Sequence, residues 1–450
     1  MKGNFDIKSV YFLGIGGIGM SALARYFKSA GVSVSGYDKT PSSITDELEI
    51  EGIKTHFTDD ISQIPKDTDL VVYTPAIPNT LNEYQYIKKQ KFPLLKRSEV
   101  LGLITENKNT LAIAGTHGKT TTTALVSHLL NSAKIEINSF IGGVAVNFNS
   151  NIVLSPNSNI FVVEADEFDR SFLTLNPNFA IITSVDADHL DIYGSKQQLI
   201  ESFKLFTSQV KDLLIVNEKI KDNFLGNKYT YSLNSKTADF YAENIQIIYG
   251  YYYFDLITPK NEIRNLKFGI AGLHNIENAI AASALVLQNG VSEADLRLGL
   301  ETFLGVHRRF EFIIRTPNLI LIDDYAHHPA EIEACLNSVK QMFPDKEITA
   351  IFQPHLYTRT RDFGDDFAQS LEIADKILLL DIYPARELPI EGISSTWLLN
   401  KINSKNKKHI QKENILEEIK KTNPQIIVIM GAGDIDRLVS IVKNNFQNTI

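Results

Sequence analysis

Cysteine is almost absent from this chain, which has only Cys335 among its 450 residues. A single cysteine cannot form an internal disulfide, and such a composition is typical of a reducing compartment. Cys335 lies at helical spacing from Ile332, Leu336 and Val339, so we expect a buried structural thiol rather than a nucleophile. The composition therefore predicts a cytoplasmic protein without structural disulfides.

An excess of positive charge is also missing, because 45 Lys and Arg stand against 53 Asp and Glu, a net charge of -8. Nucleic-acid binding generally requires a basic face, so we expect no nucleic-acid partner. No apolar run approaches the roughly 20 residues that span a membrane, and the N-terminus has no basic region followed by an apolar one. These features predict a protein with no membrane partner. We also expect small-molecule substrates and a monomer or weak homodimer, although these features do not determine the oligomeric state.

The remaining composition, 44% hydrophobic and 22% charged residues, is that of a folded globular protein. A chain of 450 residues is too long for one ordinary core and predicts two to four domains. Strand and helix patterns alternate along most of it, which favours α/β domains.

The most informative stretch runs from Thr110 to Leu130 and reads TLAIAGTHGKTTTTALVSHLL. An apolar strand leads into a glycine loop and then into an apolar helical pattern, which is the context of a phosphate-binding loop. Lys119 is expected to reach the terminal phosphates, and the Thr120 hydroxyl to ligate Mg²⁺. Only two residues separate Gly115 from Gly118, whereas the common pattern has four.

A second glycine loop follows the first strand of the chain. The strand Ser9 to Leu13 ends in GIGGIG, a helix follows, and a further strand from Val32 to Tyr37 ends at Asp38. This order is typical of a βαβ fold that binds a diphosphate at a helix N-terminus. It does not say which diphosphate.

Acidic side chains follow two apolar strands of the central region, in the segments EADEFD from Glu164 and DADHLD from Asp186. Ligands of open α/β sheets bind at such strand ends, although any one of these carboxylates could be a solvated loop residue. From Lys228 to Phe268 the alternating aromatic pattern predicts antiparallel strands at the sheet edge. Asn275 and Asn278 then share one face of a helix, although an asparagine near a helix start can also be only a cap.

A third region again places polar clusters after apolar strands, including DDYAHHP from Asp323 and QPHLYTRTR from Gln353. One phosphate-binding loop, a separate diphosphate site and a third domain with histidines and arginines together favour an amide ligase over a simple kinase. An amide ligase must phosphorylate a carboxylate and then align an amine with it.

The motifs GIGGIGMSALA, AGTHGKTTT, VEADEFDRSF, DADHLDIYG, GLHNIENAIAA, GVHRRFE, DDYAHHPAEI and FQPHLYTRTRDF resemble those of the Mur ligases, in family order from Gly14 to about Gly433. The shortened phosphate loop is the usual form of that family. The resemblance implies three α/β domains: residues 1–106, Rossmann-like, for the UDP-sugar; residues 107–305, P-loop ATPase-like with an antiparallel edge, for ATP; and residues 306–450, Rossmann-like, for the amino acid.

The resemblance also implies that L-alanine is joined to UDP-N-acetylmuramate with ATP and Mg²⁺ during peptidoglycan synthesis. It implies UDP-sugar binding by Gly14, Gly16, Gly17, Ile18, Gly19 and Asp38. It implies ATP binding by Gly115, Thr116, His117, Gly118, Lys119, Thr120, Thr121, Asn275, Asn278, Arg309 and Asp324. It implies amino-acid binding by Tyr325, His327 and Arg359, Mg²⁺ ligation by Thr120, Glu164 and His189, and catalytic roles for Lys119, Glu164, His189 and His327. Leu356 departs from the pattern, since arginine is frequent there.

Three alternatives remain open at this point. A recycling ligase that adds a whole tripeptide to the same UDP-sugar shares the first two domains, although the segment from His355 to Arg361 favours the alanine enzyme. A nicotinamide-dependent dehydrogenase would use the first glycine loop and Asp38, but it leaves the phosphate-binding loop without a task. A regulatory protein would bind ATP and catalyse nothing.

Overall fold

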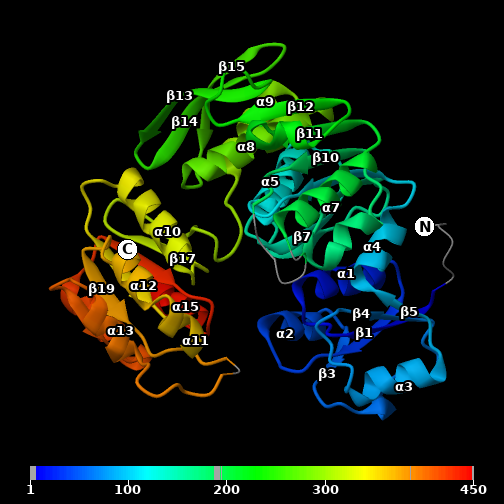
Figure 1. Cartoon of the computed structure of the whole chain (residues 1–450), viewed down its shortest axis with the longest axis horizontal. Helices are drawn as coiled ribbons and strands as arrows, with labels where there is room; N and C mark the ends of the chain where they lie inside the picture. The colour runs from blue at the N-terminus through cyan, green and yellow to red at the C-terminus, as the bar shows by residue number, and fades with distance from the viewer. Residues whose placement is uncertain (1–6, 187–192, 194, 386, 448–450) are drawn as a thin grey trace. The chain divides into compact units, whose positions relative to one another are not determined.

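The computed structural model describes residues 7–186, 193, 195–385 and 387–447. It contains three sheets flanked by helices, and its three α/β domains confirm the predicted fold class (Figure 1). The chain forms two compact units: the first comprises Met1–Glu243, Asp255–Leu266 and Ile276–Glu301, and the second comprises Asn244–Phe254, Lys267–Asn275 and Thr302–Ile450. Among the described residues, no helix has both the length and the apolar character needed to cross a membrane.

The N-terminal domain is a parallel sheet in the order β3-β2-β1-β4-β5. Its elements are β1 (Ser9–Leu13), α1 (Ile18–Ser29), β2 (Ser33–Tyr37), α2 (Ser43–Ile50), β3 (Lys54–His56), η1 (Ile61–Gln63), β4 (Leu70–Tyr73), α3 (Asn82–Gln90), β5 (Leu94–Lys96) and α4 (Arg97–Thr105). The strand order reverses between β1 and β4, and ligands of such sheets bind at the carboxyl ends of the strands beside that point.

The central sheet has the order β15-β14-β13-β12-β11-β10-β6-β9-β7-β8. The strand β6 that leads into the phosphate-binding loop is paired in parallel with β10 and β9, so the loop emerges from the middle of the sheet. The elements are β6 (Asn109–Ala114), α5 (Lys119–Ser132), β7 (Asn138–Ala145), β8 (Ser150–Val153), β9 (Ile160–Glu164), η2 (Phe168–Thr174), β10 (Phe179–Ile182), α7 (Lys196–Ser208), β11 (Leu213–Asn217), η3 (Glu218–Asn223), β12 (Lys228–Ser232), β13 (Phe240–Ile248), β14 (Tyr251–Ile257), β15 (Glu262–Phe268), α8 (Leu273–Gln288) and α9 (Glu293–Thr302).

The prediction of antiparallel strands from Lys228 onward is wrong for the first of them. Strand β12 pairs in parallel with β11, and β13 pairs in parallel with β12. Strands β13 and β14 are neighbours joined only by Tyr249 and Gly250, and so short a connection allows only antiparallel pairing. Alternation of polar and apolar residues indicates that one face of a strand is buried. It does not distinguish parallel from antiparallel pairing, which explains the error.

The first two domains share one continuous apolar core inside the first unit. Helix α1 packs on β7 and β8, and α4 packs on η2. The Tyr26 ring of α1 lies 5.7 Å from that of Phe140 in β7. The buried Asn151 side chain of β8 accepts a hydrogen bond from Arg25 and donates to the Ile18 carbonyl of α1. This packing fixes α1 relative to the central sheet.

The C-terminal sheet, in the second unit, has the order β16-β17-β21-β18-β19-β20 and is parallel except for the edge strand β16. The elements are β16 (Glu311–Arg315), β17 (Ile320–Asp324), α10 (Pro329–Met342), β18 (Ile348–Phe352), α11 (Tyr357–Asp362), α12 (Gly364–Leu371), β19 (Lys376–Leu379), α13 (Ser395–Lys401), β20 (Lys407–His409), η4 (Lys412–Asn414), α14 (Ile415–Thr422), β21 (Ile426–Met430) and α15 (Asp436–Gln447). Cys335 is buried in α10, as predicted, and burial raises the pKa of its thiol.

Candidate active site

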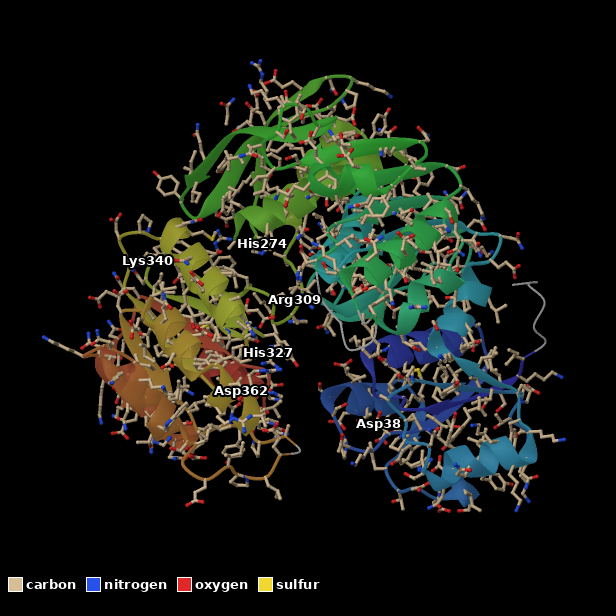
Figure 2. The ribbon with its side chains drawn as sticks, in the orientation of Figure 1. Asp38, His274, Arg309, His327, Lys340 and Asp362 are labelled. Atoms are coloured by element: carbon tan, nitrogen blue, oxygen red, sulfur yellow. The ribbon has the colours of Figure 1, made fainter. Side chains whose placement is uncertain are left out.

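The first glycine loop turns tightly between β1 and α1. Gly14 has a φ of +87°, and its N–H and that of Ile15 both donate to the Tyr37 carbonyl. The N–H of Gly16 donates to Oδ2 of Asp38 at 2.8 Å, which places Asp38 against the loop (Figure 2). Helix α1 begins at Ile18, directly after this turn. The backbone therefore presents a helix N-terminus with little steric cover, which suits a diphosphate.

The phosphate-binding loop lies against the end of β10. Gly115 has a φ of +135°, and a Cβ at this position would stand 2.0 Å from Oγ1 of Thr183. The Thr183 hydroxyl donates to the His117 carbonyl, and Oγ of Ser184 lies 2.8 Å from Oγ1 of Thr116. Thr183 and Ser184 could not be selected from the sequence, because their role depends on which strand lies beside β6.

Lys119 is held by groups of the central domain. Its Nζ donates to the Gly115 carbonyl at 2.7 Å and lies 2.9 Å from Oε1 and 2.8 Å from Oε2 of Glu167. Glu167 is fully buried, and the Tyr193 hydroxyl donates to its carbonyl oxygen. Glu167 lies in the acidic segment that follows β9 but is not among the site residues predicted from the sequence.

Thr120 and Glu164 come together as predicted, with Oγ1 of Thr120 3.2 Å from Oε1 of Glu164. The N–H of Gly142 donates to the other carboxylate oxygen at 2.9 Å, so the carboxylate is oriented by β7. A hydroxyl and a carboxylate are oxygen ligands of the kind that Mg²⁺ prefers, and this pair fits that ion. The predicted third ligand, His189, lies outside the described residues, within which no cluster of three His, Cys, Asp or Glu side chains could hold a metal.

The two asparagines predicted to lie near the adenine are both on α8. Asn278 is at the phosphate-binding loop, because a Cβ on Gly118 would stand 2.6 Å from its Oδ1. Asn275 donates from Nδ2 to the Ala271 carbonyl at the start of the same helix. Asn278 therefore contacts the loop directly, while Asn275 binds the backbone of its own helix start.

A cavity of about 530 Å³ lies between the first two domains. Gly17 and Gly19 of the first loop line it on one side, and Glu164 and Asp166 line it on the other. Arg97 also lines the cavity, and its Nη2 lies 3.6 Å from Oδ2 of Asp166. The predicted diphosphate loop and the predicted metal-binding carboxylate thus line the same cavity.

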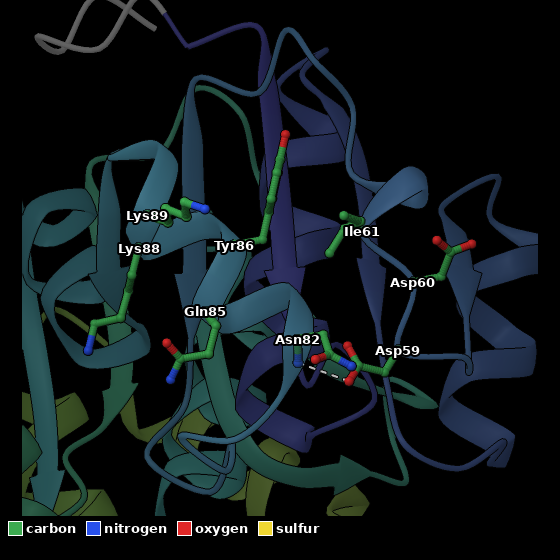
Figure 3. A pocket seen from close by; sticks show the side chains of 8 residues that line it. All are labelled: Asp59, Asp60, Ile61, Asn82, Gln85, Tyr86, Lys88 and Lys89. Carbon is green, nitrogen blue, oxygen red and sulfur yellow. Dashed lines mark hydrogen bonds between the residues drawn. The ribbon is translucent and has the colours of Figure 1, made fainter.

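A larger open hollow of about 860 Å³ on the N-terminal domain brings none of the predicted residues together (Figure 3). It lies between the segment that contains Asp59 and helix α3. The Asp59 carboxylate accepts the N–H groups of Asn82 and Glu83, so it caps α3. The fold thus uses the Asp59 carboxylate to cap α3.

In the second unit, two aspartates end strand β17. Asp324 accepts the N–H groups of Phe310 and Ala326, both at 2.7 Å, while burial raises its pKa to about 6. Burial raises the pKa of Asp323 to about 7, although Arg308 opposes the shift. The exposed Arg309, labelled in Figure 2, also lowers the pKa of Asp324, so these two predicted residues lie within electrostatic reach.

The predicted amino-acid residues gather at the carboxyl ends of β17 and β18. The His327 ring lies 5.0 Å from that of Tyr325 and 6.3 Å from that of His355. Arg359 is close enough to His355 to lower its pKa, after the larger effect of burial. Nη1 of Arg359 and Nδ1 of His355 are buried without a hydrogen-bond partner among the described residues, and such groups point to a missing ligand. His355 was in the motif but was not selected from the sequence.

Comparisons with known proteins agree along the whole chain. The Mur ligase family catalytic domain matches residues 9–109, the Mur ligase middle domain residues 113–286, and the Mur ligase glutamate ligase domain residues 308–433. A "UDP-N-acetylmuramate--L-alanine ligase" of Christiangramia forsetii is 50% identical over 98% of each chain.

Solved structures are similar as well. The UDP-N-acetylmuramate-alanine ligase of Thermotoga maritima matches 98% of this chain and 100% of its own, with a TM-score of 0.85 and 28% identity. A murein peptide ligase of Psychrobacter arcticus matches 98% and 99%, with a TM-score of 0.66 and 23% identity, and at that identity it shows only a shared fold. With three matched domains and a relative at 50% identity over nearly its full length, this chain belongs to the Mur ligase family.

Proposed function

We propose that the chain joins L-alanine to the lactyl carboxylate of UDP-N-acetylmuramate, with cleavage of ATP to ADP and phosphate, in peptidoglycan precursor synthesis. The observation that carries this proposal is the cavity of about 530 Å³, which has the diphosphate loop at Gly17–Gly19 on one side and Glu164 on the other. A substrate with a diphosphate at one end and a reacting carboxylate at the other suits that space. Relatives with this named activity support the choice of substrates.

The proposed reaction has two steps. A carboxylate oxygen attacks the γ-phosphorus of ATP, ADP leaves, and an acyl phosphate forms. The alanine nitrogen then attacks the acyl carbon, phosphate leaves, and the nitrogen loses a proton. Both steps place negative charge on phosphate oxygens, so the Lys119 ammonium and the N–H groups at the start of α5 stabilise the transition states.

We assign residues 1–106 to UDP-sugar binding, 107–305 to ATP binding and 306–450 to amino-acid binding. Thr120 and Glu164 would hold Mg²⁺, which supplies charge neutralisation on the phosphates when bound. Arg309 and Asp324 are the nucleotide-binding candidates of the second unit. In the first, Asp38 acts by holding the Gly16 backbone.

The amino-acid pocket is proposed at Tyr325, His327, His355 and Arg359. The buried Nη1 of Arg359 is a donor without a partner among the described residues, and a guanidinium pairs well with the carboxylate of alanine. Nδ1 of His327 lies 2.9 Å from the Tyr325 carbonyl, to which it donates a hydrogen bond. That contact orients the imidazole ring beside the pocket.

The test is phosphate release from ATP and Mg²⁺ with UDP-N-acetylmuramate and a panel of single amino acids, repeated with Lys119→Ala. We expect release that requires both the UDP-sugar and L-alanine and that is lost in the variant. Release with the tripeptide alone would replace this proposal by the recycling reaction. Absence of release with every acceptor would leave a nucleotide-binding protein.

A further inference from the structure

Two neighbouring carboxylates of the segment after β9 face cations in two different predicted sites. Oδ2 of Asp166 lies 3.6 Å from Nη2 of Arg97 in the N-terminal domain. Oε2 of Glu167 lies 2.8 Å from Nζ of Lys119 in the phosphate-binding loop. Adjacent residues of one segment thus contact a cation beside each glycine loop.

Arg97 belongs to the diphosphate site by its position. A Cβ on Gly19 would stand 3.0 Å from Nη1 of Arg97, so the guanidinium lies across the first turn of α1. Arg97 and Asp166 both line the cavity of about 530 Å³. A diphosphate bound at this helix N-terminus would therefore lie within reach of the Arg97 guanidinium.

The two ion pairs differ in strength. The Arg97–Asp166 pair is long and both side chains are partly exposed, and such pairs contribute little. The Lys119–Glu167 pair is short and its carboxylate is fully buried, so separating it without compensation is costly. A dianionic diphosphate attracts Arg97 more strongly than one carboxylate does, so the first pair is the one that a ligand can replace.

The segment itself is under backbone strain. Asp169 and Arg170 are consecutive non-glycine residues with φ of +52° and +55°. The left-handed region is unfavourable for such residues, so the surrounding contacts must hold them there. Asp166 supplies some of these contacts, since its Oδ1 accepts the Phe168 N–H and its carbonyl accepts the Phe172 N–H. Only the first of these contacts is made by the side chain, so a change of the Asp166 side chain acts on the backbone at Phe168, directly after Glu167.

We propose that Asp166 and Glu167 are positioning residues that couple the UDP-sugar site to the ATP site. The diphosphate takes Arg97 from Asp166 and relaxes the segment, which lowers the cost at which Lys119 leaves Glu167 for the phosphates of the nucleotide. ATP then binds more tightly, and by reciprocity it tightens the UDP-sugar by the same factor. This inference rests on the proposed function, because it requires both ligands.

The coupling is measurable by calorimetry with an ATP analogue that cannot transfer its γ-phosphate, in the presence of Mg²⁺. The Kd is determined without and with saturating UDP-N-acetylmuramate, and alanine is omitted so that no ligation occurs. We expect the UDP-sugar to tighten analogue binding by about fivefold or more, the lower range of couplings between sites. The reverse titration should give the same factor.

Two variants locate the coupling. In Asp166→Asn, which lacks the Arg97 pair, the analogue alone should bind more tightly than in the unaltered protein. The UDP-sugar should then tighten analogue binding by less than about twofold, since the Arg97 pair that the diphosphate would break is already absent. Glu167→Gln should likewise bind the analogue more tightly without the UDP-sugar and lose most of the coupling. Glu201→Gln, which removes the exposed Lys204 pair on α7, is the matched control and should retain the full coupling.

The other outcomes separate a failure of the coupling from a failure of the proposed function. If Asp166→Asn keeps the original factor, or if the unaltered protein binds both ligands independently, the inference is refuted while the proposed function stands. If the unaltered protein does not bind UDP-N-acetylmuramate at all, the proposed function and the inference both fail. A lowered Tm in Asp166→Asn with unchanged coupling would assign Asp166 a purely structural role.

Discussion

Substitution of Gly118 by alanine tests the geometry of the phosphate-binding loop. Gly118 has a φ of +80°, in the left-handed region, and its Cα lies against α8. An alanine Cβ there would stand 2.6 Å from Oδ1 of Asn278, which is shorter than a normal contact. The variant therefore combines a backbone cost with a steric one, directly before Lys119.

A matched control separates the two costs. Gly290 has a φ of +88°, and among the described residues no atom lies within 4 Å of the position that its Cβ would take. Gly290→Ala should lower the free energy of unfolding by about 1–2 kcal/mol, the cost of the left-handed region. Gly118→Ala should lose a further 1–3 kcal/mol or so from the steric contact. If the loop moves to relieve that contact, kcat/KM for ATP should fall on the order of 100-fold.

The assay combines thermal unfolding with phosphate release for the two variants, Asn278→Ala and the double variant Gly118→Ala with Asn278→Ala. Removing the Asn278 amide opens space for the new methyl group. The double-mutant cycle should therefore show a favourable interaction of about 1 kcal/mol or more. Equal activity and Tm for Gly118→Ala and Gly290→Ala, or perfect additivity in the cycle, would refute the placement of Asn278 against the loop.

Three further predictions use the same assays. Gly142→Ala places a Cβ 2.3 Å from Oε2 of Glu164 and so displaces the carboxylate. The Mg²⁺ concentration that gives half-maximal phosphate release should therefore rise about tenfold or more. An unchanged concentration would contradict the assignment of Glu164 as a metal ligand. Arg359→Lys keeps the positive charge but loses the planar guanidinium, which can donate two hydrogen bonds to one carboxylate. The KM for L-alanine should therefore rise on the order of 10-fold while the KM for ATP is unchanged. Equal rises in both KM values would count against the proposed amino-acid pocket. Asp323 has its pKa raised by burial to about 7 from 3.8, so the folded state binds the proton more tightly and loses stability as pH rises between those values. Asp323→Asn should abolish that loss of stability, which is at most about 4 kcal/mol. The measurement is the free energy of unfolding of both proteins from about pH 4 to 7.5, and parallel pH profiles would refute the prediction.

Much of the fold followed from local patterns in the sequence. The strand Ser9 to Leu13 has the predicted bounds, because buried parallel strands read as continuous apolar runs, and the strand predicted from Val32 to Tyr37 spans Ser33–Tyr37. Strand orientation at the edge of the central sheet did not follow, as β12 shows. The orientation of β12 relative to β11 depends on the path of the connection between them, which cannot be predicted from the residue types in that segment.

The parts of the candidate site that are formed by residues adjacent in sequence could be predicted. Both glycine loops were found because their conformation depends on residues adjacent in sequence. Thr183 and Glu167 were not selected, because each acts by meeting the phosphate-binding loop from another strand end. His355 was missed for a related reason, since only the structure shows its buried Nδ1 without a partner among the described residues.

The separation between the two glycine loops is set by packing, which bears on substrate choice. Asn151 of the central domain holds the Ile18 carbonyl in the first turn of α1, and the core is continuous across both domains. The N-terminus of α1 and the Glu164 carboxylate therefore line one cavity in a fixed packing arrangement. Under the proposed function, a substrate anchored by its diphosphate reaches Glu164 only if its carboxylate lies at the matching distance. Selectivity for the lactyl carboxylate then follows from the length of the molecule, and Asn151→Ala should relax it without any contact to the substrate.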